Sequence, residues 1–278
     1  MYAERPDGIE TVAAGTGAAS LPSVKRSPPG LLNNLKLAYF LAWYDVRHRY
    51  ARSVIGPFWI TLQTAIFVGC IGFVFSAISN VSVRDFLPYF AVSFVMWNLL
   101  AGATNNATTT LLGAGGFIKD RGIPAYIFYV QCFFRHVLFL AHNIVVPIAL
   151  FVFLGGTSLF GVVAAIPGIM IFMLVTLCLS LVAGTLATRY RDVQPLVESL
   201  MNLAFLASPI MWKPHLVAGR EYLLDFNPVV HLLAIWREPL LNGVMPWQSF
   251  GISLAILAVL ALMTWFAVSR LKNAAFWV

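Results

Sequence analysis

Residues 136–188 read HVLFLAHNIVVPIALFVFLGGTSLFGVVAAIPGIMIFMLVTLCLSLVAGTLAT and contain no Asp, Glu, Lys or Arg. A helix needs about 20 apolar residues to cross the hydrocarbon core of a bilayer, so this stretch is too long for one span. The pair Gly155-Gly156 lies within it and favours a turn. The stretch therefore predicts two membrane-spanning helices joined at the glycines.

Similar stretches without charge lie on both sides of this one. They cover residues 53–83 and 86–118 before it and 239–269 after it, with a shorter one at 199–212. Turn signals within these stretches predict six spans, at about residues 58–79, 86–111, 123–154, 159–187, 194–212 and 248–269. We therefore expect an all-α integral membrane domain over residues 31–278.

The composition points to the same class of protein. Of 278 residues, 60% are hydrophobic and 10% are charged, with a mean hydropathy of +0.82, whereas soluble domains carry about a quarter charged residues. Six spans would use roughly 120 residues. The remainder is too short for a large soluble catalytic domain, and a secreted protein is excluded.

The net charge of +7 follows from an uneven distribution of Lys and Arg. If the N-terminus is cytoplasmic, the inner side holds Arg5, Lys25, Arg26, Lys36, Arg47, Arg49, Arg52, Lys119, Arg121, Arg189, Arg191, Arg270 and Lys272, and the outer side holds Arg84, Lys213, Arg220 and Arg237. Thirteen inner cations against four outer ones fit the positive-inside rule. Both termini are expected in the cytoplasm, and the charge gives no reason to expect a nucleic-acid partner.

The segment before the first span divides into two parts. Residues 1–30 are rich in Ala, Gly, Ser, Thr and Pro and lack the apolar core of a signal peptide, so we expect a disordered cytoplasmic tail. Residues 31–52 carry apolar residues at helical spacing and end on Arg47, Arg49 and Arg52. They predict an amphipathic helix at the membrane interface. A charge cluster that only sets the topology is the alternative, and the two are compatible.

A second amphipathic helix is predicted between spans five and six, on the extracytoplasmic side. Asn227 can cap this helix, Pro228 suits its first position and Gly243 lies beyond its end. Pro239 should kink or end its first part. We expect the helix to lie against the outer interface, or to dip into the membrane as a re-entrant segment.

The sequence lacks the residue patterns of several kinds of chemistry. The three cysteines each fall within a predicted span and suit packing. The five histidines show no metal-ligand spacing, so no metal site is expected. No G-x-x-x-x-G-K-[ST] motif is present, so any dependence on ATP must come from a partner.

Polar side chains form a stripe in the second predicted span, where Asn98, Gly102, Asn105 and Thr109 recur at helical spacing. Polar groups are costly in lipid, so such a stripe marks either a substrate path or a contact between helices. Both interpretations stay open.

Arg135 lies inside the third predicted span, roughly 18 Å along the helix axis from its start. Gln131 and His142 share its face, and Glu198 is the one acid within a predicted span. Charges in membranes usually neutralise each other, so we expect Arg135 to pair with Glu198 or to meet an anionic group of a substrate.

Three motifs resemble one family. They are RYARSVIGPFW at residues 49–59 followed by Gln63, the stretch from YRDV at 190–193 to SPIMW at 208–212, and the stretch from Asn227-Pro228 to REPLLNG at 237–243. Together they are similar to ABC-2 type permeases that export O-antigen, capsule or teichoic acid polymers. The resemblance covers about residues 31–272.

This resemblance implies a half-transporter in the bacterial inner membrane. Two copies of the chain would form the pore, and two copies of a separate ATPase subunit would bind ATP and Mg²⁺, with no cofactor in this chain. The cytoplasmic loop at residues 113–122 would carry the element that couples to the ATPase, with Lys119, Asp120 and Arg121 as its charged residues. A loop that only sets the topology is the alternative.

The resemblance also implies a polymer attached to a polyprenyl pyrophosphate lipid. Aromatic side chains suit a sugar path, and the candidates are Tyr89, Phe90, Trp97, Trp212 and Trp236. Arg47, Arg49 and Arg52 are candidates to meet the pyrophosphate, although anionic lipid headgroups are an alternative partner.

Two other functions stay open at this point. An ABC-2 permease for a drug or a lipid would share the six spans. A prenyl-phosphate glycolipid enzyme would instead present several acids at loop ends to hold Mg²⁺, and the acids here are scattered.

Overall fold

The computed structural model describes residues 30–78, 81–121, 123–156, 158–214, 219–220 and 222–270. The predicted disordered tail lies outside these residues except for Gly30. The elements are α1 (Leu31–Arg49), α2 (Phe58–Ile78), α3 (Val83–Arg121), α4 (Tyr126–Asn143), α5 (Val145–Leu154), α6 (Leu159–Arg189), α7 (Val193–Ala207), α8 (Tyr222–Asp225), α9 (Pro228–Asn242) and α10 (Trp247–Arg270). The described part of the chain is helical and contains no strand, as the sequence predicts.

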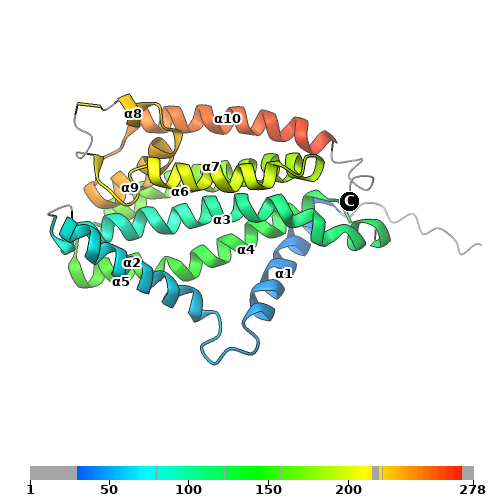
Figure 1. Cartoon of the computed structure of the whole chain (residues 1–278), viewed down its shortest axis with the longest axis horizontal. Coiled ribbons are helices and arrows are strands. Elements are labelled where there is room, and N and C mark those ends of the chain that lie inside the picture. The colour runs from blue at the N-terminus through cyan, green and yellow to red at the C-terminus, as the bar shows by residue number, and fades with distance from the viewer. Residues whose placement is uncertain are drawn as a thin grey trace, which may run out of the picture.

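The long helices lie side by side in one bundle. In Figure 1, α3, α4, α6, α7 and α10 run roughly along the long axis of the molecule, while α8 and α9 gather at one end. The C-terminal end of α10 lies at the opposite end, and α1 contacts α4 nearer that end and is tilted away from the bundle. The N-terminal helix and the α8–α9 segment therefore lie toward opposite ends of the bundle.

Among the residues that the structure describes, five helical stretches are long and apolar enough to cross a membrane. They are Phe58–Ile78, Val83–Leu111, Tyr126–Leu154, Leu159–Arg189 and Trp247–Ser269. The predicted fifth span at 194–212 is instead the apolar helix α7, whose 15 residues extend only about 22 Å against about 30 Å of hydrocarbon. It ends early because Ser208 has extended backbone before Pro209, and residues that precede proline disfavour the helical conformation.

The third predicted span contains a break between α4 and α5, which end and begin on either side of Ile144. Pro147 has no N–H to offer the Asn143 carbonyl, so the ladder of backbone hydrogen bonds is interrupted there. Helix α2 contacts this break through two hydroxyls. Thr61 Oγ1 donates to the His142 carbonyl at 2.8 Å, and Thr64 Oγ1 donates to Asn143 Oδ1 at 2.8 Å.

The cytoplasmic loop expected at residues 113–122 is helical as far as Arg121. Helix α3 has 39 residues and a length of about 58 Å, nearly twice the hydrocarbon thickness. The last turns of α3 must therefore extend beyond the membrane. The positions of Lys119, Asp120 and Arg121 form its C-terminal end, and their side chains lie outside the described part of the structure.

Helix α9 begins and ends as predicted but is far more buried than an amphipathic surface helix. The Asn227 side chain accepts the N–H of Val229, and Gly243 ends the helix with a φ of 66°. Pro239 does not end it, and His231 and Arg237 are both buried. The helix is inserted into the bundle against α3, α6 and α10.

Glycines on α6 allow this insertion. A Cβ at Gly168 would overlap the backbone carbonyl of Ile235, and a Cβ at Gly161 would lie 2.6 Å from the Pro239 carbonyl oxygen. The backbones of α6 and α9 are thus in direct contact, as small residues permit in membrane proteins.

Candidate functional site

Two adjoining hollows follow the helices α2, α3, α4 and α7. The larger has a volume of about 410 Å³ and the smaller about 160 Å³, and they share Phe67, Phe94 and Asn98. The larger is also lined by Ile60, Gln63, Thr64, Val95, Leu99, Gly102, His136, Phe139, Leu140 and Asn143, and the smaller by Trp97, Ala101, Asn105, Met201, Asn202 and Phe205. We call the two hollows together the amide groove.

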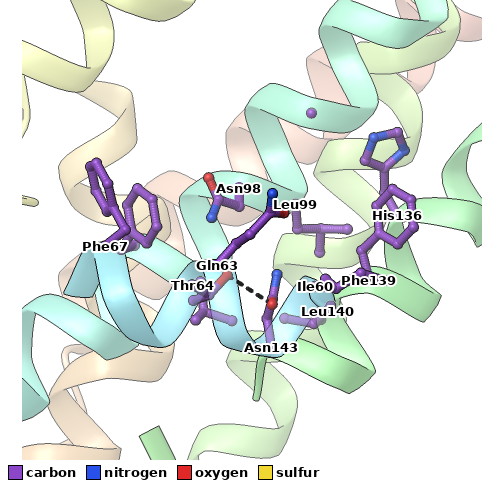
Figure 2. Close-up of a pocket in the computed structure, with 13 residues that line it drawn as sticks. Ile60, Gln63, Thr64, Phe67, Asn98, Leu99, His136, Phe139, Leu140 and Asn143 are labelled. Atoms are coloured by element: carbon purple, nitrogen blue, oxygen red, sulfur yellow. Dashed lines mark hydrogen bonds between the residues drawn. The ribbon is translucent and has the colours of Figure 1, made fainter. Parts of the chain in front are cut away.

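Four amides of this groove have hydrogen-bonding atoms without a partner. The side chains of Gln63, Asn98 and Asn202 form no hydrogen bond with the described part of the chain, and the Oδ1 atom of Asn105 is buried and unpaired. Figure 2 shows Gln63 reaching from α2 toward Asn98 on α3. Unpaired amides are costly in hydrocarbon, so this groove suits a polar occupant.

Aromatic rings line the same groove. The rings of Phe67 and Phe94 are stacked with centroids 4.5 Å apart, Phe94 meets Phe205 edge-on at 6.3 Å, and Trp97 lies 5.7 Å from Phe205. These four rings come from α2, α3 and α7. They form an aromatic wall beside the amides, which gives the groove both flat apolar faces and hydrogen-bonding groups.

Three predicted path residues, Trp97, Asn98 and Asn105, lie in the lining of the amide groove. The sequence analysis missed Gln63 and Asn202 as members of this group. In the sequence, Gln63 stands out only because it follows the motif at residues 49–59. Its position next to Asn98 depends on how α2 packs on α3. Asn202 lies on α7, where one amide within the apolar second half of the helix was the available signal.

The other predicted aromatic residues lie elsewhere. Phe90 and Trp236 are buried in the core of the chain. The Tyr89 hydroxyl donates to the Pro209 carbonyl at 2.7 Å, and the Trp212 indole N–H donates to the Leu206 carbonyl at 3.1 Å. Phe90 and Trp236 therefore pack the core, while Tyr89 and Trp212 hold the segment that follows α7.

Arg135 pairs with Asp45 of α1 rather than with Glu198. Its Nη1 atom lies 3.4 Å from Asp45 Oδ2, and Gln131 Nε2 donates to the same oxygen at 2.7 Å. Glu198 is exposed on α7, where Gln194 donates to it at 3.3 Å. The predicted pair with Glu198 is wrong because Asp45 lies on the interfacial helix, whose packing against α4 the sequence does not reveal.

Arg237, which the sequence counts among the cations of the outer side, is deeply buried. Its side chain is 2% exposed and donates to the Pro209 carbonyl at 2.9 Å and to Ser93 Oγ at 3.2 Å. Its guanidinium lies 4.5 Å from the centre of the Tyr89 ring and 3.5 Å from Glu238 Oε1. The sequence did indicate this burial, because position 237 lies one helical turn after Leu233 and therefore on the same face of the helix as that apolar residue.

A third hollow, of about 630 Å³, lies where the ends of α3, α5 and α9 meet. Two cations, Arg84 and Lys213, and two acids, Asp85 and Glu238, line it. Arg84 donates to the Leu154 carbonyl at 2.9 Å. The charges of this hollow are therefore balanced.

The three basic residues at the end of α1 are all exposed. Arg47 and Arg49 lie in its last turn, and Arg52 lies in the turn that follows. The guanidinium of Arg49 lies 5.8 Å from the centre of the Phe139 ring. Phe139 lines the amide groove, so the basic end of α1 lies next to the groove.

Comparisons with known proteins agree with this architecture. Residues 36–241 match the family described as ABC-2 type transporter. The chain is 23% identical over 214 residues to the O-antigen export system permease protein RfbA of Klebsiella pneumoniae, covering 75% of this chain and 81% of that protein. It is 20% identical over 236 residues to the protein of the same name from Myxococcus xanthus, covering 82% and 88%.

The family match spans most of the chain and includes the helices that form the amide groove. Permeases of this family are multi-pass membrane proteins that pair with ABC ATPase subunits. The protein therefore belongs to the ABC-2 type transporter family, as a membrane transport subunit and not an enzyme.

Proposed function

We propose that this chain is the permease of an exporter that moves a lipid-linked, O-antigen-like polysaccharide across the bacterial inner membrane. The observation that carries the proposal is the amide groove, which combines unpaired amides with an aromatic wall. Hydroxyls of a sugar both donate and accept hydrogen bonds, as amides do, and its apolar ring faces stack on aromatic rings. The O-antigen export permeases to which the chain is similar support the same substrate class.

Gln63, Phe67 and Asn202 of the groove lining are exposed in the single chain, which suits a pore built from two copies. Two copies of an ATPase subunit, each binding ATP and Mg²⁺, would drive the pair, and the C-terminal end of α3 with Lys119, Asp120 and Arg121 would contact the ATPase. The exposed basic end of α1, with Arg47, Arg49 and Arg52, would meet the pyrophosphate of a polyprenyl pyrophosphate-linked glycan.

The topology proposed for this function has six crossings. Helix α7 would cross together with residues 208–212, whose non-helical backbone is held by Tyr89 and Arg237 from inside the protein. Irregular backbone is tolerated at membrane depth when it is buried in protein in this way. Six crossings place both termini in the cytoplasm, consistent with the distribution of Lys and Arg.

An ABC-2 permease for an apolar drug or a simple lipid is the second candidate. Such a substrate would leave the four amides of the groove unpaired, at a cost in the membrane. This physical argument favours the polysaccharide.

Co-purification with a P-loop ATPase, followed by an ATPase assay in nanodiscs, tests the proposal. Polyprenyl pyrophosphate-linked glycan should stimulate hydrolysis, whereas the same lipid without sugar should not. Stimulation by an amphipathic drug, with none by the glycan-lipid, would favour the second candidate.

A further inference from the structure

The lining of the amide groove contains no Asp, Glu, Lys or Arg among the described residues. His136 is the one ionisable side chain in this lining. Its Nδ1 faces the Cys132 carbonyl at 2.9 Å, and its Nε2 faces Asn106 Nδ2 at 3.1 Å. Asn106 Nδ2 also donates to the Gly102 carbonyl. The Cys132 carbonyl can only accept, so Nδ1 must carry a proton, and Asn106 Nδ2 is a donor, so Nε2 must accept. The ring is therefore neutral, with its proton on Nδ1.

Two arginines inside the bundle, Arg135 and Arg237, each have an acidic partner. Arg135 pairs with Asp45, and Arg237 pairs with Glu238 while donating to backbone and to Ser93. Neither arginine lines the amide groove. The third hollow, where the ends of α3, α5 and α9 meet, holds two cations and two acids, so it adds no net positive charge. Arg49 lies beside one end of the groove, against Phe139, but is not part of its lining. Within the groove itself, an anionic polymer would therefore lose its hydration without gaining a partner of opposite charge.

The groups that face the groove suit uncharged hydroxyls. Each amide offers both donors and an acceptor, and Gln63, Asn98 and Asn202 keep theirs free of partners in the described part of the chain. We infer that the polymer moved along the amide groove is a neutral glycan, made of sugars without carboxylate, phosphate or amino charge. This inference rests on the proposed polysaccharide export and names its substrate class.

Two matched substrates test the inference with the permease–ATPase complex in nanodiscs. One is polyprenyl pyrophosphate carrying a neutral hexose polymer, and the other is the same lipid carrying a polymer of equal length with a uronic acid at every second position. The neutral glycan should stimulate ATP hydrolysis at a concentration at least roughly tenfold lower. Equal or better stimulation by the anionic polymer overturns the inference while leaving polysaccharide export standing. Stimulation by neither polymer overturns both.

Variants test whether the amides are the groups that meet the glycan. Asn98→Leu and Asn202→Leu together should raise the half-stimulating concentration of the neutral glycan roughly tenfold, since each loses hydrogen bonds to a hydroxyl. Gln248→Leu is the matched control, because Gln248 is an exposed amide on α10 and lies outside the groove lining. An unchanged concentration in the double variant overturns the role of the amides. Dissociation of the double variant into single copies, measured by light scattering, also overturns this role, because it would show that the amides join the two copies of the permease.

Discussion

The carboxylate of Asp45 on α1 lies 3.4 Å from the guanidinium of Arg135 on α4. Gln131 donates to the same carboxylate oxygen, and Asn34 at the start of α1 donates to the Tyr126 hydroxyl at 2.7 Å. Polar contacts therefore join the interfacial helix to the third span at both of its ends. Helix α1 is therefore part of the folded bundle.

Removing the charge of Asp45 should destabilise this junction. Asp45→Asn leaves Arg135 without its acid, and we expect a loss of about 1 kcal/mol in the free energy of unfolding, because both groups are partly exposed. Glu198→Gln is the matched control, since Glu198 is exposed and lacks a cationic partner in the described structure. Thermal unfolding in detergent measures both. Equal effects of the two substitutions would contradict the pair with Asp45.

Arg237 should be among the most sensitive positions of the fold. Arg237→Ala removes buried hydrogen bonds to the Pro209 carbonyl and to Ser93, and we expect a cost of about 3 kcal/mol. The exposed Arg220 provides the control variant Arg220→Ala, whose effect should be close to zero. Thermal unfolding compares them, and similar melting temperatures would show that Arg237 does not hold α9 to the core.

The contact between α6 and α9 predicts a difference between two glycines. Gly168→Ala places a Cβ against the Ile235 carbonyl and should destabilise the protein by about 2 kcal/mol, because two backbones must separate. Gly251→Ala on α10 meets open space and should be neutral or stabilising by up to about 1 kcal/mol. The same loss of stability in both variants would contradict the inserted position of α9.

The C-terminal end of α3 should couple the permease to its ATPase. Alanine at Lys119, Asp120 and Arg121 together should leave ATP hydrolysis largely insensitive to glycan-lipid, because the charged contacts to the ATPase would be lost. The ratio of stimulated to basal ATPase rate is the measurement. A ratio equal to that of the unsubstituted complex would move the coupling element to another part of the chain.

Features that depend on nearby residues could be predicted from the sequence. The first span at 58–79 is α2 at Phe58–Ile78, and the cap at Asn227 and the end at Gly243 lie where turn chemistry placed them. The extension of α3 to Arg121 was missed because charged residues are typical of loops. A helix tolerates them in water, and Pro124 lies just beyond its end.

Features that depend on how helices pack could not be predicted in the same way. Asp45 and Arg135 are 90 positions apart in the sequence. Many other groups that meet in the bundle are also distant from each other in the sequence. Hydropathy also assigns every aromatic residue of a span to the same class, so it could not separate Phe90 in the core from Trp97 at the groove. Charge counting likewise assigns Arg237 to the outer side of the membrane but does not reveal that its side chain is buried, because this burial depends on the insertion of α9.

Transport itself gives the most direct test of polysaccharide export. Inverted membrane vesicles holding the permease and its ATPase would receive polyprenyl pyrophosphate linked to a radiolabelled neutral glycan on their outer face. The account predicts that ATP makes the label resistant to an added glycan hydrolase, and that vesicles without the permease stay fully sensitive. If ATP instead drives a drug or a phospholipid across while the glycan stays fully accessible to the hydrolase, the account is contradicted.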